Sequence, residues 1–420
     1  MTRLAKLLTR FHTAAGQPRL DAGGQAPWLR VLPVALVGVL IAGWFVAERV
    51  GLPETFEPAA PFVVGTERGY DVELRERGID LPDQLSVVGY DGQWYLIQAN
   101  DPLALTDLLD RMDAPRYRAL RVLYPALGWL FAAGQAPATP YALLAVGMLA
   151  FGFGCAVAGR IVSAYGRSPW WGLLFAAVPG AQIGLGWGTA EPLALALGIL
   201  GISLVLDRRY LLAGLAFAGS ALTKETYLAF AAVTAVFLVV DAIARQAVTR
   251  RLLRQLAAIV LPGAVTLFGW WVYVEHTLPW VYNPHGALGR FSLPFVGWFE
   301  VLTTIARAEY PNRGLFGIPS EPAMVVSFAV LVAAAGLALW LRQSLLAYHA
   351  FAWAMFGLII AGFLLERYGS AQRTLAPSLL VALLFLVTVR FTNRSPAPVP
   401  ATATPAGERP DPNDLPEAGH

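Results

Sequence analysis

Long runs of apolar residues, separated by short polar segments, make up most of this chain. A bilayer core about 30 Å thick needs about 20 apolar residues per crossing helix, with a range of roughly 17–25. By that rule we expect ten spans, near residues 31–48, 139–159, 169–187, 190–206, 211–223, 226–243, 256–275, 323–341, 345–365 and 374–391. The predicted fold class is an all-α integral membrane protein, a polytopic bundle of about 10–11 transmembrane helices.

An eleventh apolar stretch, 119–134, would raise the number of transmembrane helices from ten to eleven if it crossed the bilayer. It contains Pro125 and begins with two arginines, Arg118 and Arg121. We expect it to be interfacial or re-entrant, which is allowed where its backbone is buried in protein. The alternative is that it spans the bilayer.

Positive charge in the short loops predicts which ends of the spans face the cytoplasm. Lys and Arg gather in a basic tail (1–30) and around 160–167, 208–209, 245–254, 342 and 390–394, so we expect these segments and both termini inside. The outer side then receives the loops 49–118 and 277–322, the tips at Glu191 and Lys224-Glu225, and the turn 366–373. The polytopic domain covers 31–393, and the Pro/Ala-rich tail 394–420 is expected to be disordered. No small-residue cleavage site follows the first apolar run, so we expect an anchor rather than a cleaved signal.

Composition narrows the class further. Only 14% of the residues are charged, whereas soluble domains carry roughly a quarter. The net charge of +3 is too small to indicate nucleic acid as a partner. A single cysteine, Cys155, cannot form an intramolecular disulfide. The chain lacks a Walker motif, which argues against an ATP-driven pump.

The predicted span 211–223 has thirteen residues and would rise only about 20 Å. If its inner end is at the membrane surface, Lys224 and Glu225 lie within the depth of the membrane. Charges there are costly, and they mark either a functional site or a paired structural bond. Both interpretations remain open for these two residues.

The outer loop 49–118 contains the stretch GYDGQWYL, which places Asp91 between two glycines and among aromatic residues. Other polar groups are predicted on the same side: Asp101, Asp107, Asp110, Asp113, Arg116, Arg118, Arg121, Glu191, Lys224, Glu225, Glu366, Arg367 and Arg373. Carboxylates and arginines together suit transfer of a group from a phosphate to a hydroxyl. A carboxylate takes the hydroxyl proton, and arginine neutralises the departing phosphate. The alternative is that these charges are solvated or contact lipid headgroups.

Several of these segments resemble the PIG-V-like mannosyltransferases and a bacterial family assigned to cell-surface glycopolymer formation, both of GT-C type. The first-loop stretches are GYDGQWYLIQANDP and APRYRALRVLYPALGWL. The turns TAEPL and ALTKET and the start of the final helix, RTLAP, are also similar. The resemblance covers roughly residues 85–391.

The resemblance implies an exterior-facing transferase in the plasma membrane that uses a polyprenyl-phosphate sugar donor and a glycan or lipid acceptor. It implies Asp91 as the catalytic base. By matched position, the substrate-site candidates are Tyr90, Gln93, Arg118, Tyr124, Glu191, Lys224, Glu225 and Arg373. PIG-V-like proteins often have a histidine after the aspartate pair, where this chain has Gln93-Trp94-Tyr95. Some GT-C enzymes use two acidic residues and a metal, so a divalent metal is possible, with Glu191 or Asp101 as the second carboxylate.

Two other classes remain open. A flippase or transporter for a lipid-linked sugar would have charges in the middle of spans or matching broken helices in two halves. In this chain the charges are predicted at the outer ends of helices, and the two halves do not match, which favours an enzyme. A non-catalytic subunit of a glycan-assembly system would tolerate the loss of Asp91.

Overall fold

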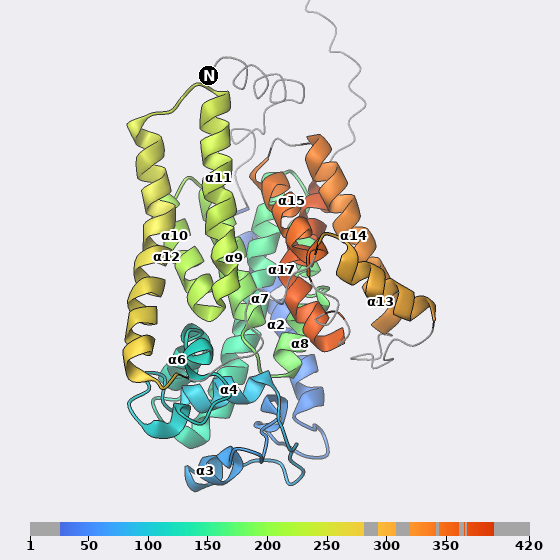
Figure 1. The fold of residues 1–420 in the computed structure, drawn as a ribbon. Coiled ribbons are helices and arrows are strands. Elements are labelled where there is room, and N and C mark those ends of the chain that lie inside the picture. Colours follow the sequence, from blue (N-terminus) through green and yellow to red (C-terminus); the bar gives the residue numbers. More distant parts are fainter. Residues whose placement is uncertain are drawn as a thin grey trace, which may run out of the picture. The chain divides into compact units, whose positions relative to one another are not determined.

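The computed structural model describes residues 26–280, 293–307, 320–341, 344–360, 365 and 368–389. The predictions for the segments 1–30, 277–322 and 394–420 lie largely or wholly outside these residues. Within them the backbone forms helices and turns, with one isolated bridge between Gly65 and Ser86 and no strand. The all-α prediction is therefore confirmed for this part of the chain (Figure 1).

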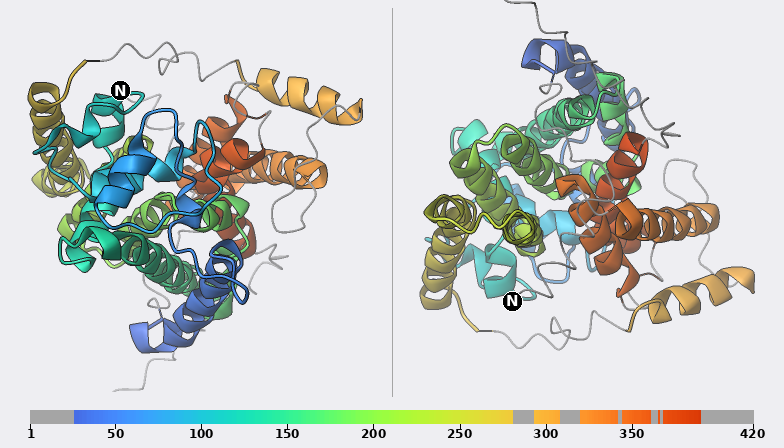
Figure 2. Two further views of the ribbon diagram at one scale, coloured as in Figure 1. Left: turned by 90° about the horizontal axis from the view of Figure 1, so that it is seen from below. Right: turned by 90° about the horizontal axis from the view of Figure 1, so that it is seen from above.

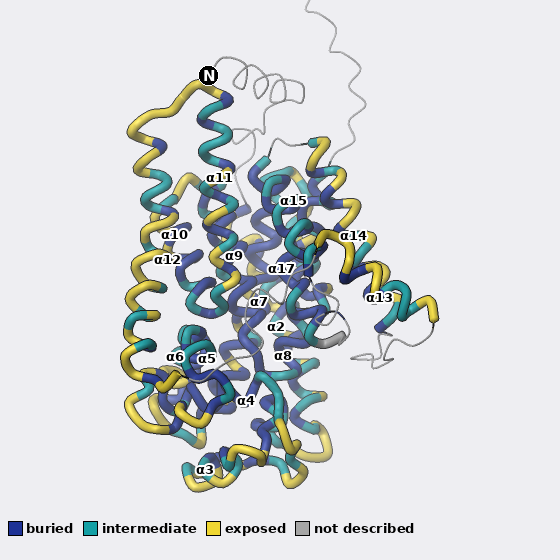
Figure 3. Tube along the Cα trace, in the orientation of Figure 1, coloured by how far each residue is buried: buried dark blue, intermediate teal, exposed yellow. Residues whose placement is uncertain are grey.

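Among the residues that the structure describes, six helices are long and apolar enough to cross a membrane. They are α2 (Trp28–Arg49), η3 with α7 (Ala136–Ala138, Thr139–Ala164), η5 with α11 (Glu225–Leu228, Ala229–Ala244), α12 (Arg250–Thr277), α14 (Ser320–Leu341) and α17 (Tyr368–Thr388). In the apolar part of η3 and α7 78% of the residues are buried, but only 17% of those in α12, which is coloured mostly exposed and intermediate in Figure 3. Helices of this kind indicate a multi-pass membrane protein.

Four shorter apolar helices accompany them: α9 (Glu191–Leu206), α10 (Tyr210–Thr223), α13 (Val296–Ala306) and α15 (Leu345–Leu358). The 14 residues of α10 rise about 21 Å, which confirms that this segment is too short to cross the whole hydrocarbon core. Glycines allow its close packing. A Cβ on Gly214 would overlap the carbonyl oxygen of Ala258 in α12, and one on Gly201 in α9 would overlap the ring of Phe217.

The prediction of one continuous helix over 169–187 is wrong. The chain forms η4 (Pro169–Leu174) and then α8 (Pro179–Gly186). Pro179 has no N–H to continue a helix, and it disfavours helical geometry in the residue before it. Val178 accordingly has an extended backbone, with φ −78° and ψ 113°. Hydropathy alone does not register this break, because both pieces are apolar.

The stretch 119–134 contains only one short helix, α6 (Leu123–Phe131), after α5 (Pro115–Ala119). Nine residues rise about 13 Å, so α6 cannot cross a bilayer core. Its length agrees with the expectation of an interfacial or re-entrant segment. Between residues 119 and 167, all of which the structure describes, η3 with α7 is the one helical segment long and apolar enough to cross a membrane.

The helices have two distinguishable ends. At one end Arg160 of α7 donates to the carbonyl of Ala26 before α2, over 3.0 Å. At the other end Arg49 of α2 donates to the carbonyl of Gly186 in α8, over 2.8 Å. The turn between α11 and α12 lies at the opposite end from the first loop (Figure 1), and Figure 2 looks onto each end. Two segments predicted on opposite sides, 49–118 and 245–254, thus lie at opposite ends of the helices.

The first loop is itself folded. It contains η1 (Ala60–Phe62), α3 (Tyr70–Glu76), α4 (Asp91–Ala99) and η2 (Asp107–Leu109). Buried apolar side chains such as Phe62, Leu74 and Leu108 belong to the same core cluster as residues of α7. This packing holds α4 and α5 against the ends of the long helices.

Candidate active site

Asp91 is the first residue of α4, and the backbone around it requires glycine. Gly89 adopts a positive φ of 76°, a region that glycine enters without steric cost. At Gly92 a Cβ would overlap the carbonyl oxygen of Trp187, before α9. The two glycines of the GYDG stretch therefore turn the chain and press the start of α4 onto the 187–191 segment.

Two arginines from different parts of the chain hold the Asp91 carboxylate. Arg118 Nη1 donates to Oδ1 over 2.9 Å, and Arg373 Nη1 donates to Oδ2 over 3.0 Å. Burial opposes ionisation of Asp91, but attraction to Arg373 and Arg118 outweighs it and holds the pKa of this carboxyl well below its usual range. Asp91 is therefore ionised at neutral pH.

Arg118 is fixed by a second carboxylate. Its Nε and Nη2 donate to the two oxygens of Asp113 over 3.0 and 2.8 Å. Its guanidinium also lies over the ring of Trp94 in α4, 5.5 Å from the centroid. A planar guanidinium bound in this two-pronged way cannot rotate, so its remaining Nη1 is directed at Asp91.

Arg373 in α17 is fixed in the same way by Glu191, the first residue of α9. Its Nε and Nη2 donate to Glu191 Oε1 over 3.0 and 2.9 Å. Glu191 is fully buried, and it also accepts from Lys224 Nζ over 3.0 Å and from the Thr189 hydroxyl. Arg373 Nη1 reaches Tyr90 as well, 3.0 Å from its hydroxyl.

These contacts form one chain of alternating charge, running Asp113, Arg118, Asp91, Arg373, Glu191, Lys224. A separate pair lies beside it. Arg121, just after α5, donates through Nε and Nη2 to the two oxygens of Glu225, each over 2.9 Å, and also contacts the Tyr117 hydroxyl.

A cavity of about 240 Å³ opens onto this cluster. Its polar lining contains four cations, Arg118, Arg121, Lys224 and Arg373, and two carboxylates, Asp91 and Glu225, a difference of +2. The lining also includes the apolar and aromatic side chains of Tyr227, Phe356, Ile360 and Pro377. A cavity of this construction suits a ligand with both an anionic group and an apolar chain.

The structure thus brings five of the predicted residues together on the cavity lining: Asp91, Arg118, Lys224, Glu225 and Arg373. Tyr90 contacts this group through its hydrogen bond with Arg373. Glu191 belongs to the same cluster but lies behind Arg373 rather than on the cavity wall.

Three predicted residues lie elsewhere. Gln93 accepts from the Gly65 N–H and donates to the Val88 carbonyl, so it braces the turn before Asp91. Tyr124 is buried in α6 and donates to the Leu143 carbonyl over 3.0 Å. Asp101 accepts from the backbone of Leu105 and Thr106 and closes a loop.

Arg121 and Asp113 belong to the cluster but were not among the predicted substrate residues. A sequence signal exists for each. Arg121 follows Tyr117 by four residues, a spacing that places side chains together on a helical turn. Asp113 precedes the basic segment and lies five residues before Arg118. The sequence alone does not indicate that Glu225, about a hundred residues later, completes the Arg121 site.

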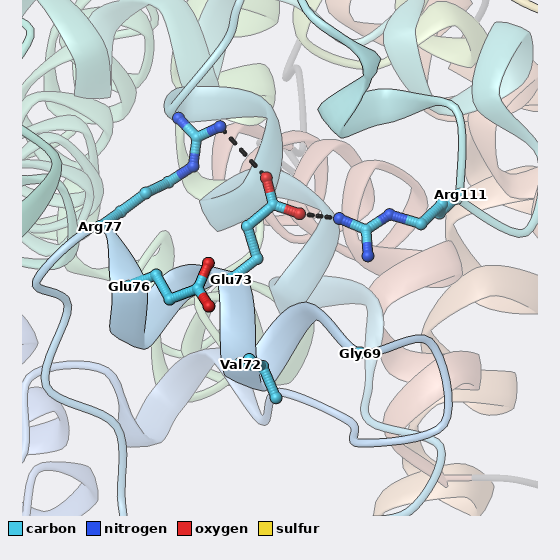
Figure 4. A pocket seen from close by; sticks show the side chains of 6 residues that line it. All are labelled: Gly69, Val72, Glu73, Glu76, Arg77 and Arg111. Carbon is cyan, nitrogen blue, oxygen red and sulfur yellow. Dashed lines mark hydrogen bonds and ion pairs between the residues drawn. The ribbon is translucent and has the colours of Figure 1, made fainter.

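A second, more open hollow lies on α3 and involves other charges. Figure 4 shows Glu73 between Arg77, 3.1 Å away, and Arg111, with Gly69, Val72 and Glu76 around them. The two arginine side chains are 32% and 47% exposed. This hollow contains no residue of the Asp91 cluster.

The acidic side chains of the site also bear on metal binding. In the part of the chain that the structure describes, no three His, Cys, Asp or Glu side chains are grouped as a metal ion would require. Asp91 and Glu191 are instead joined through the guanidinium of Arg373, which bonds to both.

Comparison with known proteins found no matching family model, no matching curated protein and no matching solved structure.

Proposed function

We propose that this chain is a membrane glycosyltransferase of GT-C type. It transfers a sugar from a polyprenyl-phosphate donor to a hydroxyl of a cell-surface glycan or lipid, at the outer face of the plasma membrane. The observation that carries the proposal is the composition of the cavity. One carboxylate suited to act as a base, Asp91, shares the cavity with four cations and with apolar side chains.

In the proposed step the acceptor oxygen forms a bond to the anomeric carbon of the sugar. The bond from that carbon to the phosphate oxygen breaks, and the polyprenyl phosphate leaves with the electron pair. The acceptor proton passes to Asp91. The arginine and lysine side chains stabilise the negative charge that develops on the phosphate.

The low pKa of Asp91 bears on the timing of proton transfer. A base works best when its pKa lies near the working pH, and Asp91 is far below it. The hydroxyl becomes strongly acidic, however, once its oxygen has begun to bond to an oxocarbenium-like carbon, the kind of transition state that glycosyl transfer to water also has. A permanently ionised, firmly oriented carboxylate is sufficient to accept a proton that leaves late.

The test is transfer of labelled sugar from polyprenyl-phosphate donors to lipid or glycan acceptors by the full chain in liposomes. Asp91→Asn is expected to lower turnover by about 100- to 10,000-fold, the usual loss when a general base is removed. The variant is expected to fold, because Arg118 keeps Asp113 and Arg373 keeps Glu191 as ionic partners. Asp83→Asn, an exposed aspartate of the same loop outside the cavity, is the matched control.

Equal turnover by wild type and Asp91→Asn would remove Asp91 from the mechanism. Absence of turnover in both, with labelled donor crossing the bilayer, would overturn the transferase proposal in favour of a flippase.

A further inference from the structure

The four cations that line the cavity are not equivalent. All three donor nitrogens of Arg118 are engaged, two with Asp113 and one with Asp91. Those of Arg373 are engaged too, with Glu191, Asp91 and Tyr90. A ligand would have to displace an ionic bond to reach either guanidinium.

Arg121 and Lys224 differ in this respect. Arg121 bonds through Nε and Nη2 to Glu225, and its Nη1 has no hydrogen-bond partner among the described residues. The Nζ ammonium of Lys224 has three N–H donors and makes one hydrogen bond within the described chain, to Glu191. Both side chains are largely buried, 7% and 14% exposed, and both line the cavity.

The described part of the chain does not seal Arg121 Nη1 from solvent, so this donor is accessible at the cavity that Arg121 lines. An acceptor on a ligand can therefore bond to it without breaking an ionic bond. Arg121 and Lys224 are connected through the carboxylate that pairs with Arg121. Glu225, which orients Arg121, follows Lys224 directly in the chain. Lys224 also lies over the Tyr227 ring, 5.9 Å from its centroid, and Tyr227 is part of the cavity lining.

We infer that the four cations lining the cavity have two different roles. Arg121 and Lys224 form the subsite that binds the phosphate of the lipid donor, oriented by Glu225 and Glu191. Arg118 and Arg373 are positioning residues, which hold the Asp91 carboxylate. The apolar chain of the donor then lies along Tyr227 and Phe356. This inference rests on the proposed function, since it names the roles of residues within that same site.

The test is binding, measured without sugar transfer. The purified full chain in detergent micelles is titrated with a polyprenyl monophosphate and, in parallel, with the corresponding prenyl alcohol and with inorganic phosphate. Wild type is expected to bind the phosphate lipid more tightly than the alcohol. Competition by inorganic phosphate at similar concentration would overturn the lipid as the source of the phosphate.

Two variants remove the subsite while leaving no buried carboxylate alone. The double variant Arg121→Gln/Glu225→Gln replaces the ion pair by a neutral one, and Lys224→Met leaves Glu191 paired with Arg373. Each is expected to weaken binding of the phosphate lipid by about 10- to 100-fold, as loss of a charge-assisted hydrogen bond predicts. Binding of the alcohol should not change.

The matched control is Arg116→Gln/Glu275→Gln, an Arg–Glu pair outside the cavity, which is expected to bind as wild type does. Arg118→Gln is expected to alter the pH dependence of transfer and to leave phosphate-lipid binding within about threefold of wild type. Unchanged binding by both subsite variants would overturn the inference. The proposed function would still stand if those variants transferred sugar, and it would fall separately if wild type bound the lipid without transferring anything.

Discussion

Asp91 and Glu73 each lie between two arginines, yet they belong to different kinds of structure. The arginines beside Asp91 are 16% and 6% exposed, whereas those beside Glu73 are 32% and 47% exposed. Arg77 lies one helical turn from Glu73, but Arg373 is 282 residues away from Asp91. The Asp91 arginines are also held from behind by Asp113 and Glu191.

The difference shows that the surroundings of an ion pair decide whether the pair indicates a functional site. Exposed pairs contribute little, since water and salt screen them and the side chains lose entropy on pairing. Buried charges persist only where partners satisfy them on every side. A chain of six alternating charges at the ends of apolar helices is costly to bury, and such a feature by default indicates function.

The largest expected effect comes from Glu191→Gln. Glu191 is fully buried and balances both Arg373 and Lys224. Removing its charge leaves Lys224 without its ion-pair partner and Arg373 with Asp91 alone, and loss of one partner of a buried pair costs about 3–5 kcal/mol. The free energy of unfolding in mixed micelles measures this.

Adding Lys224→Met to Glu191→Gln is expected to recover part of that stability, because the cation that lost its ion-pair partner is then gone. A loss below about 1 kcal/mol in the single variant would mean that the chain of charges is no more important than the pairs on α3.

The next effect is on pH dependence. Removing Arg118 takes away one of the cations that lower the pKa of Asp91, so that pKa rises in Arg118→Gln. Asp91 must be ionised to accept a proton, so the acid limb of the pH–rate profile moves to higher pH. The attraction stabilises the wild-type fold above the ordinary Asp pKa of about 3.9, and this contribution is lost as pH falls through the lowered folded-state value.

Arg111→Gln, which removes a partner of Glu73, is the control, and its acid limb should superimpose on that of wild type. If the Arg118→Gln profile also superimposed on wild type, Asp91 would not be the group that titrates in catalysis.

The smallest effect is expected for Glu73→Gln. Its arginine partners reach solvent, so the loss of unfolding free energy should be no more than about 1 kcal/mol, with transfer activity unchanged. Denaturant unfolding and the liposome assay together measure this. A loss as large as that of Glu191→Gln would show that the first loop depends on its surface charges rather than on its apolar core.

Hydropathy determined the membrane class, the all-α fold and the approximate place of the long helices, because an apolar run of that length has few alternatives in a bilayer. It also placed Asp91, Glu191, Lys224 and Arg373 at one end of the bundle. Hydropathy did not predict the break in the helix before Pro179, since the segments on both sides of this residue are equally apolar.

Only the tertiary structure decided which charges meet. The partners of Asp91, Glu191 and Glu225 lie 27 to 282 residues away in the chain, on different helices. The tertiary structure also showed that Gln93 and Tyr124 have a different role from Arg121. Gln93 and Tyr124 bond to the backbone, whereas Arg121 lines the cavity and its Nη1 has no partner among the described residues. Burial and donor geometry arise from the packing of several helices at once, and no local pattern in the sequence encodes them.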